Sequence, residues 1–149
     1  MAASPGGYYP PVGFHFKVEF IGIGNDNDSR FQSVSGLTVE YDTESFKEGG
    51  ENRFEHKLPV RTKYNDISLK RGMLTNSMVI EWCKQAFENR LFLPVMVNIT
   101  LLNDKHEPLK NWIVVDAWPK KWSVSDFNAQ ENSIVVETLD LAYKYFKVL

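Results

Sequence analysis

One cluster of residues has the types, but not the spacing, of a cation site. Residues 26–28 read Asp-Asn-Asp, like the opening of a calcium-binding loop. Such a loop needs a glycine where Phe31 stands and a bidentate glutamate where Leu37 stands. The three histidines are 41 and 50 residues apart, so none has the short spacing of paired metal ligands. We therefore expect no metal site, and we expect the histidines on strand faces or at the surface.

The candidate nucleophiles and phosphate-binding turns are also incomplete. Residues 33–36, Ser-Val-Ser-Gly, lack the first glycine of a hydrolase nucleophile elbow. Gly22 and Gly24 follow a strand-like run, but neither the third glycine nor the helix of a dinucleotide-binding turn comes after them. Cys83, the single cysteine, lies on an apolar stripe, which favours a buried side chain over a reactive thiol. These patterns predict neither an enzyme nor a cofactor.

The composition is that of one globular domain. The chain has 149 residues, of which 43% are hydrophobic and 24% charged. We expect an extended N-terminal arm over 1–13 and one domain over 14–149. The net charge of −2 lacks the basic excess typical of nucleic-acid binding, so no such activity is expected. Apolar runs stay far below the roughly 20 residues of a membrane-spanning helix, so no span is expected either.

Alternating apolar and polar residues predict strands over most of the chain. The first covers 14–20, where four apolar side chains alternate with His15, Lys17 and Glu19. Glycines 49 and 50 predict a turn between two strands, the second of which we expect to end at Pro59. The full set of expected strands is 14–20, 37–46, 54–58, 67–70, 95–101, 109–118, 122–124 and 134–146.

A single segment, over 76–89, has the periodicity of a helix. Thr75, Asn76 and Ser77 are all suitable N-cap residues. The apolar stripe that we expect to face the core consists of Met78, Val79, Trp82, Cys83, Ala86 and Phe87. Many strands and one helix, without a βαβ rhythm, predict a mainly β fold of two packed antiparallel sheets, either a β-sandwich or a partly closed barrel.

The long strands carry polar faces that a lone subunit would leave in water. Copies of the chain in an assembly would instead cover these faces and pair the strand edges. The turn at Gly49 and Gly50 has charges of both signs around it, which suit a contact with a neighbouring copy. An ordinary exposed loop explains the same residues equally well.

Five segments of the chain resemble the inner tail-tube proteins of contractile phages. They are 31–37, 48–59, 69–72, 116–122 and 132–139. The resemblance implies the fold of the type VI secretion tube protein, with two packed β-sheets and one helix. It further implies a structural role, in which six copies form a ring and rings stack into a hollow tube. The implied partners are adjacent rings, the spike hub and baseplate proteins, and the sheath around the tube.

The resemblance also implies a stacking loop that reaches the adjacent ring. That loop corresponds to Phe46, Lys47, Glu48, Gly49, Gly50, Glu51, Asn52, Arg53, Phe54, Glu55 and His56.

Within the family, three segments are most similar to the tube-initiator paralogue of extracellular contractile injection systems. They are 9–14, 48–54 and 81–84. This paralogue forms the first ring above the spike hub. Phage main-tube proteins carry a similar Glu-Gly-Gly-Glu-Asn loop, so a main tail-tube subunit stays open. A stand-alone β-sandwich binding module is the alternative from another class. Either tube role implies assembly in the bacterial cytoplasm and release by lysis as part of a phage-tail-like particle.

Overall fold

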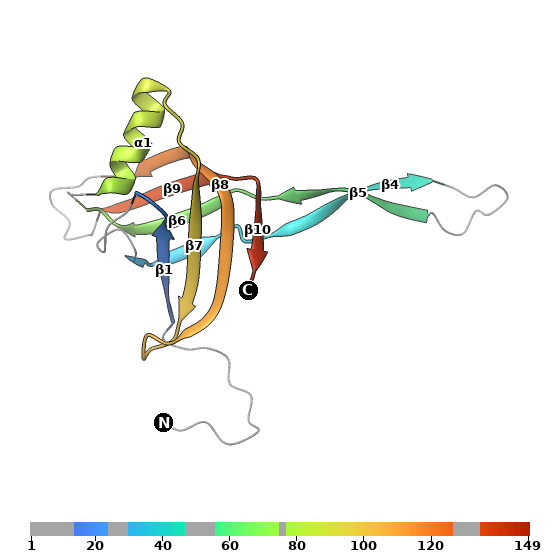
Figure 1. The fold of residues 1–149 in the computed structure, drawn as a ribbon, viewed down its shortest axis with the longest axis horizontal. Coiled ribbons are helices and arrows are strands. Elements are labelled where there is room, and N and C mark those ends of the chain that lie inside the picture. The colour runs from blue at the N-terminus through green and yellow to red at the C-terminus, as the bar shows by residue number, and fades with distance from the viewer. Residues whose placement is uncertain (1–13, 24–29, 47–55, 75–76, 127–134) are drawn as a thin grey trace, which may run out of the picture.

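The computed structural model describes residues 14–23, 30–46, 56–74, 77–126 and 135–149. The predicted mainly β fold with one helix is confirmed, and the arm predicted over 1–13 lies outside the described residues (Figure 1). In chain order the elements are β1 (His15–Phe20), β2 (Arg30–Phe31), β3 (Ser33–Ser35), β4 (Val39–Phe46), β5 (His56–Tyr64), β6 (Ile67–Gly72), α1 (Met78–Asn89), β7 (Val95–Leu102), β8 (Pro108–Val124), β9 (Val136–Ala142) and β10 (Tyr145–Val148).

Strand β8 joins two antiparallel layers into one strongly bent sheet. The strand order is β2-β1-β7-β8-β9-β6-β3, with β10 also paired to β8. The first half of β8 pairs with β7 and β10, and its second half pairs with β9. Asp116 has a φ of 56° at the point where the partners change, next to a register shift against β7. The order is an open path, so the sheet is not a closed barrel.

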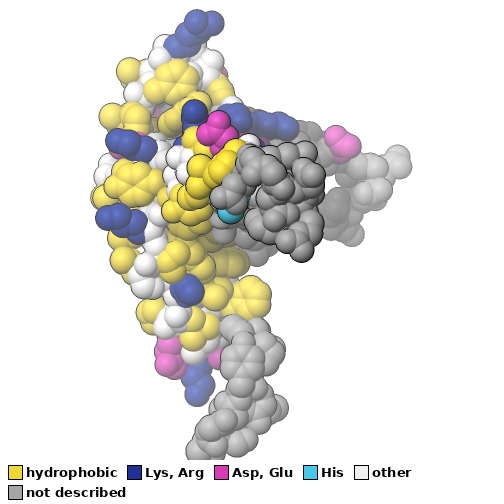
Figure 2. Space-filling model, turned by 90° about the vertical axis from the view of Figure 1, so that its right-hand side faces the viewer, with side chains coloured by type: hydrophobic (Ala, Val, Ile, Leu, Met, Phe, Trp, Pro, Cys, Tyr) yellow, Lys and Arg dark blue, Asp and Glu magenta, His cyan; other side chains and the backbone are white. Residues whose placement is uncertain are grey.

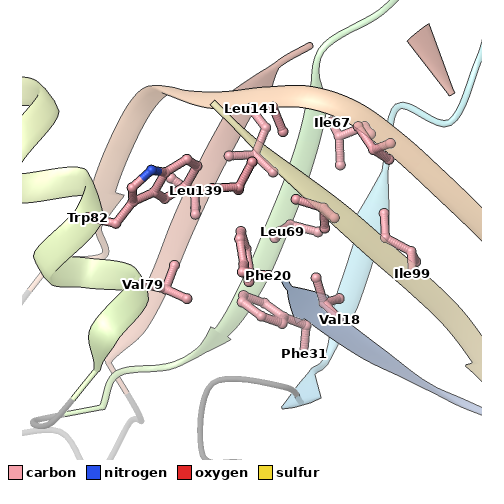
Figure 3. Close-up of a cluster of buried hydrophobic side chains, with 14 of the residues drawn as sticks. Val18, Phe20, Phe31, Ile67, Leu69, Val79, Trp82, Ile99, Leu139 and Leu141 are labelled. Carbon is pink, nitrogen blue, oxygen red and sulfur yellow. The ribbon is translucent and has the colours of Figure 1, made fainter. Parts of the chain in front are cut away.

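The core lies between the two layers because their strands bury every second side chain. In β6 and β9 the buried side chains alternate with partly exposed or exposed ones. Figure 3 shows aliphatic side chains of both layers meeting there. Those with little or no exposed surface include Val18, Ile67, Leu69, Val97, Ile99, Val114, Leu139 and Leu141.

Helix α1 packs one stripe of side chains against the sandwich (Figure 3). It begins two residues later than predicted, with Ser77 as the N-cap, whose Oγ accepts a hydrogen bond from the Ile80 amide at 3.2 Å. Arg90, with a φ of 53°, ends it in the left-handed conformation. The buried stripe consists of Val79, Trp82, Cys83 and Ala86, at helical spacings of three, one and three.

The predicted stripe was too wide at both ends. Met78 and Phe87 are 53% and 46% exposed, so neither belongs to the core of this subunit. Both side chains lie at the margins of the buried row, where the curved sheet no longer covers the helix surface. Periodicity alone cannot separate the centre of a stripe from its margins.

Three predicted strand boundaries were wrong. Pro59 does not end a strand, because β5 continues to Tyr64. Asp42 faces Arg61 and Thr43 faces Pro59, so Val60 is an extra residue in β5, and a proline is tolerated beside such a bulge.

The other two concern β8, β9 and β10. The predicted strands at 109–118 and 122–124 are one continuous strand, β8. The predicted strand over 134–146 divides into β9 and β10, because Tyr143 and Lys144 turn the chain from one layer to the other.

A buried ion pair between β6 and β9 also contacts the start of helix α1. Arg71 Nε lies 3.0 Å from Glu137 Oε2, and the two side chains are 4% and 3% exposed. Trp122 Nε1 donates to Glu137 Oε1 at 2.9 Å, and Arg71 Nη2 donates to the N-cap oxygen of Ser77 at 2.9 Å. The guanidinium carbon lies 4.7 Å from the centre of the Phe31 ring. One charged pair therefore contacts β2, β8, β9 and the N-terminus of α1.

Replacing Arg71 by Met should lower the free energy of unfolding by about 3–5 kcal/mol, because it leaves the Glu137 carboxylate buried without its partner. The double variant Arg71→Met, Glu137→Leu should recover most of that loss. Lys17→Met is the control, since the Lys17–Glu19 pair is largely exposed and should contribute under about 1 kcal/mol. Urea unfolding measures all three, and equal losses for Arg71→Met and Lys17→Met would contradict the prediction.

Replacing Trp82 by Ala should cost about 3–5 kcal/mol. The ring is 6% exposed, contacts Phe20 at 5.7 Å between centroids, and donates through Nε1 to the Leu93 carbonyl oxygen at 2.7 Å. Phe87→Ala on the same helix is the matched control and should cost under about 1 kcal/mol. Thermal unfolding of the pair checks this, and a Trp82→Ala curve that overlays the parent curve would refute it.

Candidate assembly surface

Strands β4 and β5 form a ribbon that extends from the sandwich into solvent (Figure 1). All eight residues of β4 are exposed, and so are seven of the nine residues of β5. Its two strands pair only with each other in the strand network of the described residues. A two-stranded ribbon is at best marginally stable in water, so this one has the character of a surface that another chain covers.

The side chains of the ribbon fit an interface better than a free surface. Near the body, Glu40 lies opposite Lys63, and Asp42 lies opposite Arg61. Opposite charges across a strand pair stabilise the ribbon modestly. Large apolar side chains are exposed as well, at 47–63% of their surface. They are Val39, Tyr41, Phe46, Leu58 and Val60. Apolar groups of this size beside polar ones mark interaction sites.

The two described ends of the predicted stacking loop, Phe46 and His56, lie at the far end of this ribbon. Phe46 ends β4 and His56 begins β5, and they are register partners. Their rings stack with centroids 5.1 Å apart and an angle of 19° between planes. Residues 47–55 of the predicted loop lie outside the described residues. The structure thus places both described ends of the loop together, at the tip of the ribbon (Figure 1).

A second apolar region lies around the helix. Phe92 and Trp118 pack edge to face at 5.7 Å, and both are partly exposed. A shallow pocket of about 290 Å³ lies between the helix and the end of β8, lined by Cys83, Phe87 and Trp122 among others. From the side of the ribbon, apolar side chains alternate with Lys and Arg along one edge of the molecule (Figure 2).

The described residues contain no cluster suited to metal binding. No group of three or more His, Cys, Asp or Glu within them could hold a metal ion. Burial, followed by the negative charge of Glu137, raises the pKa of the Cys83 thiol to about 12, so this side chain stays protonated and unreactive at neutral pH. No helix in this part of the chain is long and apolar enough to span a membrane.

One contact between two histidine side chains was not predicted from the sequence. His15 Nε2 and His106 Nδ1 lie 2.9 Å apart, within hydrogen-bond distance. They are 91 residues apart in the sequence. Only the pairing of β1 with β7, and the turn from β7 into β8, bring them together. No spacing rule would have found them, because the contact depends on strand order.

Comparisons with solved structures place this fold among tube proteins. A chain in the cryo-EM structure of the anti-feeding prophage baseplate is 28% identical, with a TM-score of 0.82, over 95% of this chain and 97% of that one. A chain in the sheath–tube complex of an extracellular contractile injection system, PVC, is 27% identical, with a TM-score of 0.77, over 95% of this chain and 92% of that one. No curated protein sequence matches.

A more distant structure shares the fold alone. Hcp1 from Flavobacterium johnsoniae is 15% identical, with a TM-score of 0.54, over 90% of this chain and 94% of that one. The implied likeness to the type VI secretion tube fold is therefore confirmed.

The family model described as T4-like virus tail tube protein gp19 matches residues 12–147. This family is structural rather than enzymatic. The family-level resemblance seen in the sequence is confirmed. Because the model matches nearly the whole chain, this protein belongs to the T4-like virus tail tube protein gp19 family.

Proposed function

We propose that this tail-tube protein forms a six-membered ring, in which the β4–β5 ribbon of each copy is covered by neighbouring copies. The observation that carries the proposal is the exposure of the ribbon, whose β4 strand has no buried residue. In a closed ring each copy offers the same two complementary surfaces, so every ribbon finds a partner and no edge is left open.

Stacking of such rings explains the position of the loop at the ribbon tip. The two described ends of the loop over 46–56 lie at the end of the ribbon that is farthest from the sandwich (Figure 1). We assign it to the contact with an adjacent ring. Each single contact can be weak, because six copies engage at once and raise the effective concentration of the rest.

Within the particle, we propose that this ring initiates the tube above the spike hub. The chain superposes on the anti-feeding prophage baseplate chain with a TM-score of 0.82, and on the PVC sheath–tube chain with 0.77. The motif combination over 9–14, 48–54 and 81–84 supports the same role. The second candidate is the main tube subunit, which the likeness to the sheath–tube complex favours.

These roles define the partners and the place of assembly. An initiating ring contacts the hub or baseplate on one side and a tube ring on the other, with the sheath outside. The exposed face of α1, with Glu81, Lys84 and Glu88, is the surface that we assign to the sheath side. We further propose assembly in the bacterial cytoplasm and release of the finished particle by lysis.

Replacing residues 47–55 by Asn-Gly should leave the subunit folded but abolish ring stacking. Phe46 and His56 are direct partners, so a two-residue turn closes the ribbon without disturbing the register. Negative-stain electron microscopy, carried out with the main tube protein of the same particle so that an initiating ring has a ring to stack on, should show stacked rings for the parent protein and single rings for the variant. Lys105→Ala, in the exposed β7–β8 turn, is the control and should stack normally. A shortened variant that stacks like the parent protein would refute the role of the loop.

Electron microscopy and native mass spectrometry of the concentrated protein test the proposed role directly. An initiator should give rings of six that stop at one layer, or that form only with the hub protein. Long tubes from the protein alone would instead identify a main tube subunit. A monomer under both conditions would reject both tube roles and favour the stand-alone binding module.

A further inference from the structure

Two connecting segments, the first and the second crossing, join the ribbon to the sandwich and contact each other. The chain enters β4 through 36–38 and leaves β5 through Asn65 and Asp66. The Asn65 amide donates to the Thr38 carbonyl oxygen at 3.3 Å. Gly36 has a φ of +89°, and a Cβ added to it would lie 2.0 Å from the Asp66 carbonyl oxygen. The two crossings are thus packed so closely that only glycine fits at this point.

Three aromatic rings hold the second crossing against the sandwich. Tyr64, the last residue of β5, packs edge to face on Tyr143 at 5.9 Å and on Phe146 at 5.2 Å between centroids. Tyr143 and Phe146 lie 6.2 Å apart. Phe146 is 8% exposed and belongs to the core, so the base of the ribbon is anchored in the most rigid part of the subunit.

Two polar contacts fix the same crossing from the side of the sandwich. The Tyr143 hydroxyl donates to the Asn65 carbonyl oxygen at 2.6 Å. Burial, followed by the negative charge of Asp66, raises the pKa of Tyr143 to about 12, so the hydroxyl keeps its proton at neutral pH. Lys120 Nζ lies 2.6 Å from Asp66 Oδ2 in a partly exposed ion pair. Asn65 and Asp66, the two residues of the second crossing, are therefore held by different parts of the sandwich. Asn65 is held by Tyr143 in the turn between β9 and β10, and Asp66 by Lys120 in β8.

Because the ribbon is long, a small change in the angle at which it leaves the sandwich would move its tip by several ångströms. The eight residues of β4, at about 3.3 Å each, form a lever of about 26 Å. A tilt of about 10° at the base would move the tip by about 4.5 Å, close to the spacing of about 4.8 Å between paired strands. A modest loss of order at the base would misplace the tip by one strand.

We propose that Tyr143, acting with Tyr64 and Phe146, is the positioning residue that sets the direction of the β4–β5 ribbon relative to the sandwich. The geometric part of this inference concerns the subunit alone. Its consequence, correct placement of the tip against neighbouring copies, rests on the proposed function.

Distance measurement by double electron–electron resonance tests the geometric part on the isolated full-length chain. Spin labels at Ser45→Cys and Lys110→Cys report on the outer ribbon and on the sandwich, since both positions are exposed. Cys83 is buried and its thiol is protonated at neutral pH, so it stays unlabelled. The parent protein should give one narrow distance distribution.

Tyr143→Ala should widen that distribution at least about twofold, because the ring contacts and the hydrogen bond are both lost. Tyr143→Phe keeps the ring and should widen it less. Tyr145→Ala is the matched control, because Tyr145 lies two residues away and its ring contacts Lys147 at 5.9 Å. Equal widths for the parent protein and Tyr143→Ala, or equal widening by Tyr145→Ala, would overturn the proposal.

A second variant keeps the test decisive if Tyr143→Ala does not fold, as circular dichroism would reveal. Gly36→Ala forces the two crossings apart, since its Cβ cannot occupy the same space as the Asp66 carbonyl oxygen. It should shift the distance by several ångströms or widen it, and an unchanged distribution would overturn the proposal. Ring stacking of the folded Tyr143 variants is then examined separately. Failure of the parent protein to form rings would reject the proposed function, whereas the distances still decide the role of Tyr143.

Discussion

The buried ion pair between Arg71 and Glu137 is the contact on which the packing of this subunit depends. A charged pair inside a protein is costly unless its remaining hydrogen-bonding capacity is satisfied. Here Trp122 and the N-cap residue Ser77 supply those further contacts at 2.9 Å each. The pair therefore fixes where the helix begins, and so which of its side chains face the sheet. An apolar pair would not impose this register, because hydrophobic contacts are not directional.

The rest of the fold consists of a core whose side chains bury one another and a β4–β5 ribbon whose side chains are exposed. Strand β8 lets one sheet serve as two layers, and the aliphatic side chains between them exclude water without help from another chain. The β4–β5 ribbon has the opposite character, with charged and apolar side chains exposed on an isolated strand pair. In the proposed ring, neighbouring copies would cover the ribbon and pair its free edges.

The comparisons show that the fold is retained among chains that differ at most of their residues. The chain shares 27–28% identity with chains of the anti-feeding prophage baseplate and the PVC sheath–tube complex, and 15% with Hcp1, while the fold is retained. Alternation of apolar residues in the layers can survive such divergence, because many aliphatic residues fill a core about equally well.

Residue patterns alone predicted the class of fold, the single helix and the family. Period-two alternation is clear in β1 and β7, and helical spacing is clear from Val79 to Ala86, so local patterns sufficed there. The packing of the folded chain was needed to show that Met78 and Phe87 lie outside the core, and that Pro59 lies beside a bulge within a strand. It also revealed the Arg71–Glu137 pair and the hydrogen bond from Tyr143 to Asn65, whose partners are 66 and 78 residues apart in the sequence. The physical reason is that periodicity records which face of an element is buried, whereas contacts between distant residues depend on strand order, bulges and turns.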